Sequence, residues 1–210
     1  IPPAQAVEEK DKAVLAVFTL DGQLQEAPKG DDLLFGSVGG QPLKDLVARM
    51  KKVCDDDQVL GIVLLPENSQ MGLAQVEEIR RVLGEIKSAG KEVHVHVDSL
   101  TTRGYALCSG ASSISVVPTG MVMITGLRAE QPYLRGLLDM IGVEPDFMTC
   151  GQFKSAGEMF MRTGPSEEDE KMTNWLLDSM YETIVQLIAD GRGVSADKAR
   201  DWIDGGLYTA

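Results

Sequence analysis

The chain has 210 residues, and its 20 Lys and Arg side chains against 32 Asp and Glu side chains give a net charge of −12 at pH 7. A hydrophobic content of 43% is ordinary for a globular protein and excludes a wholly disordered chain. Such an acidic chain lacks the basic surface that nucleic acid requires, so we expect no nucleic-acid partner. No apolar run approaches the ~18–20 residues that a transmembrane helix needs.

The first half of the chain alternates between the period of strands and the period of helices. Strands are predicted at 13–20, 59–65 and 91–97, and amphipathic helices at 43–53 and 73–89. The first of these strands is apolar throughout, which predicts burial on both faces. Strands that alternate with helices over short connections predict a parallel sheet with right-handed crossovers and flanking helices, the α/β class.

The second half continues with shorter elements. Pro165 and the acidic residues that follow it predict the start of a long helix, with Ser166 as its cap, and Ser195 is predicted to cap the last helix. We find no repeat and no internal linker, so we predict a polar lead-in at 1–12 and a single domain over 13–210. The remaining elements predicted are helices at 104–109, 134–141, 166–190 and 195–203, and strands at 113–117, 121–124 and 146–150.

Most motifs of catalysis and metal binding are absent from the sequence. It contains no HExxH, no GxSxG and no EF-hand loop, and we therefore expect neither a metal nor a cofactor. Cys54, Cys108 and Cys150 form no CxxC pair and are interpreted as buried free thiols. His94 and His96 lie two residues apart and share one face of a strand, either as a polar surface or, with Asp98, as a metal site.

Lys154 stands out within the segment 151–157 (GQFKSAG). It directly follows the strand predicted at 146–150, its neighbours are apolar or small, and no acidic residue is adjacent to it. If the ammonium is buried there, desolvation favours the neutral amine, which can take a proton near neutral pH. A Ser–Lys peptidase uses a lysine in this way in place of histidine, whereas an exposed loop lysine would have no catalytic role.

The segment Phe153-Lys154-Ser155-Ala156-Gly157-Glu158, followed by Arg162 and Pro165-Ser166, resembles the Tyr-Lys-Ser-Ala block of the signal peptide peptidase A (protease IV) family. Weaker similarities are Gly104-Tyr105 and the turn Pro118-Thr119-Gly120. The resemblance runs from about residue 13 to the end of the chain. It implies a Clp-protease/crotonase-like fold and the role of general base for Lys154.

Two departures from the family pattern concern the other catalytic groups. The nucleophile of an active half lies in a Ser-Gly-Gly-Tyr stretch, but this chain has Thr102-Arg103-Gly104-Tyr105. The Pro-Gly-Gly loop that would donate N–H groups to an oxyanion is replaced here by residues 66–72 (PENSQMG). In the duplicated long type of this family, the N-terminal half contributes the lysine and the C-terminal half the serine, and this chain resembles the N-terminal half.

The resemblance implies the lysine-contributing half of a membrane-associated serine peptidase that degrades released signal peptides. Its expected partners are the peptide substrate, a serine-bearing half beyond residue 210 and further copies in a homo-oligomer. The expected location is the extracytoplasmic (periplasmic) side of the inner membrane. One alternative is a non-catalytic oligomerisation or interaction module. Another is a crotonase-type acyl-CoA enzyme, which the changed loop at 67–72 argues against.

Overall fold

The structure is a computed structural model that describes residues 14–26, 42–67 and 70–209. It divides into two compact units. Unit 1 comprises the residues up to 125 together with 184–210, and unit 2 comprises residues 126–183. The lead-in expected at 1–12 lies outside the described residues, and the single domain over 13–210 stays a prediction. The two units are described separately below.

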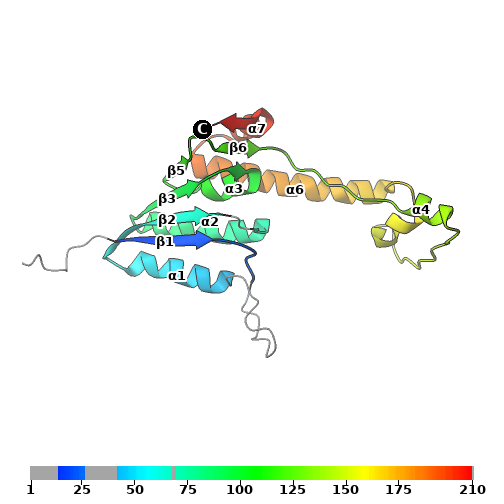
Figure 1. Ribbon diagram of the computed structural model, residues 1–210, viewed down its shortest axis with the longest axis horizontal. Helices are drawn as coiled ribbons and strands as arrows, with labels where there is room; N and C mark the ends of the chain where they lie inside the picture. The colour runs from blue at the N-terminus through cyan, green and yellow to red at the C-terminus, as the bar shows by residue number, and fades with distance from the viewer. Residues whose placement is uncertain (1–13, 27–41, 68–69, 210) are drawn as a thin grey trace, which may run out of the picture. The chain divides into compact units, whose positions relative to one another are not determined.

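A sheet of four parallel strands forms the centre of unit 1 (Figure 1). In spatial order the strands are β1 (Val14–Leu20), β2 (Val59–Pro66), β3 (Glu92–Val97) and β5 (Ser113–Val116). Helix α1 (Leu43–Asp55) connects β1 to β2, and helix α2 (Leu73–Ser88) connects β2 to β3. The predicted α/β fold with a mostly parallel sheet and flanking helices is therefore confirmed.

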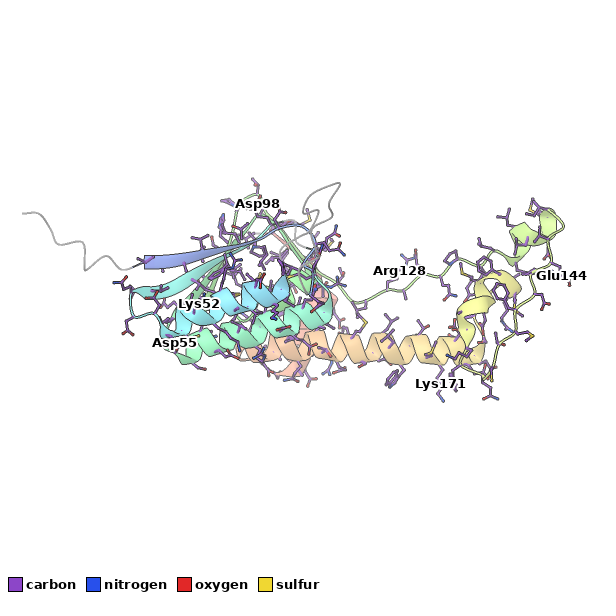
Figure 2. The ribbon with its side chains drawn as sticks, turned by 90° about the horizontal axis from the view of Figure 1, so that it is seen from below. Lys52, Asp55, Asp98, Arg128, Glu144 and Lys171 are labelled. Carbon is purple, nitrogen blue, oxygen red and sulfur yellow. The ribbon has the colours of Figure 1, made fainter. Side chains whose placement is uncertain are left out.

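The core of unit 1 lies between one face of this sheet and helices α1 and α2. The two helices lie side by side on that face, and Lys52 and Asp55 are on the exposed side of α1 (Figure 2). Burial of these apolar stripes supplies most of the stability expected for the unit. The largest fully buried side chains between the two layers are Leu20, Leu43, Leu46, Met50, Ile62, Leu64, Ile79, Leu83 and Ile86.

The opposite face of the sheet is uncovered, which corrects the expectation for the first strand. Val17 is 60% exposed and Leu60 is 59% exposed. Only alternate residues of β1, such as Phe18 and Leu20, are buried. Strand β1 is an edge strand with helices on one side, so its continuous apolar run does not indicate burial on both faces.

A second, smaller sheet completes unit 1. It consists of β4 (Leu100–Thr101), β6 (Met121–Ile124) and β7 (Gly206–Thr209), with β4 parallel and β7 antiparallel to β6. Helix α3 (Thr102–Cys108) follows β4 directly. Helix α7 (Ala196–Gly205) begins where predicted, and the Oγ of Ser195 accepts a hydrogen bond from the N–H of Lys198 at 3.2 Å.

The long helix α6 (Glu167–Arg192) begins in unit 2 and ends in unit 1. Two polar side chains hold its last turns within unit 1. Arg80 Nη2 donates to the carbonyl oxygen of Leu187 at 2.9 Å, and Ser109 Oγ donates to the same oxygen at 3.1 Å. Ser109 is fully buried, so its hydrogen bond also satisfies a hydroxyl that would otherwise be costly to bury.

Unit 2 consists of short helices and irregular segments that precede α6. The elements are α4 (Arg135–Met140), the 3₁₀ turn η2 (Ser155–Gly157) and α5 (Glu158–Met161). The strand predicted at 146–150 is wrong, because this segment is irregular and almost wholly exposed. A strand needs a neighbour to receive its backbone hydrogen bonds, and residues 126–183 contain no strand that could pair with it.

Unit 2 has an exposed apolar surface and no apolar core of its own. Within residues 126–183, all of which the structure describes, only Gly157 and Asp169 are buried. Met148 is 100% exposed and Trp175 is 71% exposed. Soluble monomers rarely expose so many large apolar side chains in one small unit. In the described part of the chain, no helix is both long enough and apolar enough to cross a bilayer.

Candidate functional site

Lys154 lies on a tight turn of unit 2, immediately before η2. Its backbone N–H donates to the carbonyl oxygen of Gly151 at 3.3 Å, and Lys154 caps the 3₁₀ turn that follows. The side chain is exposed, as is its neighbour Phe153. The strand predicted before Lys154 is absent, and of the two alternatives for its side chain, buried or exposed, the structure shows the exposed one. Among the described residues, no carboxylate lies within ion-pair distance of its ammonium, in agreement with the absence of an adjacent acid in the sequence.

A carboxylate fixes the helical turn that begins at Lys154. The two oxygens of Glu158 accept hydrogen bonds from the backbone N–H of Ser166 at 2.9 Å and from its hydroxyl at 2.6 Å. These hydrogen bonds, above all the one from the hydroxyl, lower the pKa of Glu158. Ser166 Oγ accepts in turn from the N–H of Asp169 at 3.1 Å, so the predicted cap of the long helix is confirmed.

Aromatic packing supports the same turn from a second direction. The rings of Phe147 and Phe160 stack with their centroids 5.5 Å apart. Gly157 lies against the Phe147 ring, where an added Cβ would come within 3.2 Å of the ring atoms. A side chain at this fourth position of the Lys-Ser-Ala-Gly run would therefore make the Phe147 ring shift by a few tenths of an ångström.

The nucleophile position of the resembled family is occupied by Thr102, and its hydroxyl is fully engaged. Thr102 Oγ1 donates to the carbonyl oxygen of Thr125 at 2.7 Å and accepts from the N–H of the same residue at 2.8 Å. A hydroxyl that bridges both backbone groups of one residue is a structural link between the start of α3 and the end of β6. It is not poised to attack a carbonyl, since no base contacts it.

The loop that would form an oxyanion hole is also committed to structural contacts. Residues 68 and 69 lie outside the described part of the chain. The N–H of Gln70 donates to the carbonyl oxygen of Gly22 at 2.9 Å, and the N–H of Gly72 donates to the side chain of Gln75 at 3.0 Å. Arg103, in place of a glycine, donates to the carbonyl oxygen of Met71 at 2.8 Å. Neither Gln70 nor Gly72 has an N–H group left to stabilise a developing oxyanion.

The two histidines lie on the outer face of β3, as predicted. His94 Nδ1 is 2.7 Å from Ser113 Oγ, and His96 Nδ1 is 3.2 Å from Ser115 Oγ. His94 Nε2 also lies 2.8 Å from a carboxylate oxygen of Glu92. The described residues include no cluster of three or more His, Cys, Asp or Glu side chains that could hold a metal ion. These contacts with serine hydroxyls and a carboxylate make this part of β3 a polar face.

A cavity of about 270 Å³ opens at the carboxyl ends of β2 and β3 in unit 1. Among its lining residues are Glu67, His96 and Asp98. In parallel α/β sheets, ligands bind at this end of the strands. Of the residues discussed for catalysis, neither Lys154 nor Thr102 lines this cavity.

One family profile and several known proteins are similar in sequence to this chain. The profile of Peptidase family S49 matches residues 85–210. The chain is 27% identical to the chloroplastic serine protease SPPA of Arabidopsis thaliana over 94% of its own length and 28% of that protein. It is 31% identical to protease 4 of Haemophilus influenzae over 73% of its length and 25% of that protein.

A third relative is the putative signal peptide peptidase SppA of Enterococcus faecium, which is 25% identical over 79% of this chain and 48% of that protein. The chain thus spans between a quarter and a half of the length of the curated relatives that it matches. The family profile covers more than half of the chain, including α3, the lysine turn and α6. The three relatives described above are named serine protease SPPA, protease 4 and putative signal peptide peptidase SppA. The chain therefore belongs to peptidase family S49.

Proposed function

We propose that this chain is the lysine-contributing half of a serine peptidase with a Ser–Lys dyad, which degrades released signal peptides. The observation that carries the proposal is a contrast between two positions. Lys154 is exposed on a turn that other residues hold in place, whereas the hydroxyl of Thr102 and the loop after β2 are used for structure. Because the Thr102 hydroxyl at the position of the family's nucleophile is engaged, the serine of the proposed dyad would come from another domain.

The uncovered apolar surface of unit 2 supports a partner at this location. Phe153 is adjacent to the lysine, and Phe147 and Met148 lie in the segment that leads to it; all three are exposed. A serine-bearing half that covers these side chains would also remove water from the Lys154 ammonium. Desolvation would then favour the neutral amine that a general base requires. Binding of the serine-bearing half would therefore also activate Lys154 as a base.

In this mechanism, Lys154 Nζ takes the proton from the partner's serine hydroxyl as the serine oxygen attacks the peptide carbonyl. The resulting ammonium gives the proton to the leaving amine, and an acyl-enzyme remains. Lys154 then takes a proton from water as the water attacks the ester carbonyl, and the ammonium returns this proton to the serine oxygen as the acyl C–O bond breaks and the second product leaves. The oxyanion donors belong to the partner half, since Gln70 and Gly72 are engaged here.

The family resemblance extends the proposal to location and assembly. The peptidase would be associated with the inner membrane on its extracytoplasmic (periplasmic) side, where released signal peptides remain in the bilayer. It would also assemble as a homo-oligomer, in which further copies cover the apolar surfaces that unit 2 exposes.

The test is peptide hydrolysis by a full-length protein that carries both halves. Lys154→Arg keeps the positive charge but cannot act as a base near neutral pH, so we expect a loss of ~10²–10⁴ in kcat, equal to the loss in Lys154→Ala. Lys171→Arg is the matched control, because Lys171 is another exposed lysine of unit 2 and its variant should keep normal turnover. Near-normal turnover by Lys154→Arg would show that Lys154 is not the base.

A second candidate is a non-catalytic interaction module of the same family. The engaged hydroxyl of Thr102 favours it, because this half has lost its own nucleophile. In that case the apolar surface of unit 2 would serve assembly alone, and both Lys154 variants would keep full activity in the full-length protein. The same measurement therefore separates the two candidates.

A further inference from the structure

Glu158 connects the lysine turn to the N-terminus of α6 through two hydrogen bonds. Its carboxylate accepts from the N–H of Ser166 at 2.9 Å and from the hydroxyl of Ser166 at 2.6 Å. Its side chain is only 16% exposed, although most of unit 2 is open to solvent. A partly buried carboxylate that receives two donors makes short, charge-assisted hydrogen bonds, which are the strong kind.

Glu158 is also directly coupled to Lys154 along the backbone. Lys154 caps η2, and the N–H of Glu158 closes that turn by donating to the carbonyl oxygen of Ser155. α5 continues from Glu158 without interruption. The orientation of the lysine turn therefore depends on where the carboxylate of Glu158 is held.

Few other contacts in unit 2 hold this turn. No apolar side chain in residues 126–183 is fully buried, so there is no hydrophobic core behind it. The other supports are the stack of Phe147 on Phe160 and a backbone hydrogen bond of 2.6 Å from the N–H of Leu134 to the carbonyl oxygen of Met159. A base acts only when it lies within hydrogen-bond reach of the proton it takes, and a misplacement of 1 Å can cost ~10²-fold in rate.

We propose that Glu158 is a positioning residue for Lys154, which it holds by clamping the lysine turn to Ser166 at the start of α6. This inference rests on the proposed function of Lys154. Glu158 does not touch the substrate in this account, and it acts through the lysine alone. Its effect on turnover should therefore disappear when the lysine is absent.

The experiment is a double-mutant cycle in the full-length protein that carries both halves. We expect Glu158→Ala to lower kcat by ~10–10²-fold, with KM within about twofold of wild type. In the Lys154→Ala background, Glu158→Ala should cause no further loss. A residue that only stabilises the unit would cost activity in both backgrounds, and that result would overturn the inference.

Three further variants keep the test decisive if Glu158→Ala does not fold. In Glu158→Gln, the amide oxygen can accept from the N–H of Ser166 while the amide nitrogen donates to Ser166 Oγ, so kcat should stay within about threefold of wild type. Ser166→Ala removes the hydroxyl hydrogen bond to Glu158 and also the cap that Ser166 Oγ provides to the N–H of Asp169. It should give an intermediate loss, and only the part of that loss that disappears in the Lys154→Ala background reports on positioning. Glu167→Ala removes an exposed acid next to Ser166 and should change nothing.

Different results would contradict the role of Lys154 as the base and the role of Glu158 as its positioning residue. If Lys154→Ala keeps its activity, the proposed function is wrong and the role of Glu158 is wrong with it. If Lys154→Ala is inactive but Glu158→Ala and Ser166→Ala turn over normally, only the positioning role is overturned.

Discussion

Cys108 shows how burial controls chemistry at a single residue of this chain. It is the last residue of α3 and is completely buried. The interpretation of the three cysteines as buried thiols is therefore confirmed for Cys108 but is wrong for Cys150, which is exposed. Desolvation raises the pKa of the Cys108 thiol to about 12, although the nearby Arg80 acts in the opposite direction. Since the thiolate is the reactive form, Cys108 should be inert in the folded protein.

The expected result is that thiol reagents at about pH 8 modify the exposed Cys150 in the native chain but modify Cys108 only after unfolding. Mass spectrometry of the alkylated protein, with and without denaturant, measures both sites. Cys54, of intermediate exposure, serves as an internal reference. Equal labelling of Cys108 and Cys150 in native buffer would contradict the buried position of Cys108.

At the lysine turn, only part of the site could be predicted from the residues. Lys154 was identified by its motif, and Ser166 by the capping pattern of a serine before acidic residues. The partnership between Glu158 and Ser166 was missed. It joins two residues eight positions apart across an irregular segment, and no local period or propensity indicates such a contact. Burial of Lys154, one of the two alternatives for its side chain, depended on a strand at 146–150 that does not form.

Strand β2 contains a glycine, Gly61, that cannot be replaced by a larger residue without straining the sheet. An added Cβ at Gly61 would lie 2.5 Å from the carbonyl oxygen of Glu92 on the neighbouring strand β3. Because the atoms that this Cβ would contact belong to the backbone of Glu92, the strain cannot be relieved by moving a side chain. Gly61→Ala should therefore lower the free energy of unfolding of unit 1 by about 1–3 kcal/mol.

Gly84 is the matched control for this prediction. It lies inside helix α2, and an added Cβ there meets no atom within 4 Å. Gly84→Ala should raise the free energy of unfolding by about 0.5–1 kcal/mol, because alanine restricts the unfolded chain and favours the helix. Urea unfolding followed by circular dichroism compares the two variants, and destabilisation by both would contradict the packing described here.

Helices α1 and α2 could be predicted from their apolar period, and the central parallel strands from continuous or alternating apolar runs. Strand β7 could not, since Gly206–Thr209 has no period and becomes a strand only by pairing with β6, more than 80 residues earlier. The exposed face of β1 was missed for a related reason. An apolar run shows that a strand can be covered on both faces, but it does not show whether the cover belongs to the same chain.

At the scale of the whole molecule, stability should be unevenly distributed between the two units. Unit 1 has a fully buried core between its sheet and helices, whereas unit 2 buries only Gly157 and Asp169. Local opening costs little free energy where few apolar groups are buried. In the 210-residue chain alone, backbone amides of α4 and α5 should therefore exchange hydrogen much faster than those of β2 and α2.

Hydrogen exchange with mass spectrometry measures this difference. A serine-bearing half added in trans should slow exchange in residues 126–183 and leave unit 1 unchanged, because it would cover the apolar surface of unit 2. Strong protection of α4 and α5 in the chain alone would mean that unit 2 is stable without a partner, against the burial pattern described above.

Because the proposed base and the proposed serine belong to different halves, we expect that the 210-residue chain alone hydrolyses no peptide or ester above background. It has a lysine, but the Thr102 hydroxyl bridges the backbone of Thr125, and the N–H groups of Gln70 and Gly72 are already bonded. A base without a nucleophile and an oxyanion site cannot form an acyl-enzyme. The measurement is fluorogenic peptide hydrolysis by the purified chain and its Thr102→Ala variant, with the full-length protein as the positive control. Turnover by the chain that disappears in Thr102→Ala would identify Thr102 as a working nucleophile, and this half would then be a peptidase in its own right.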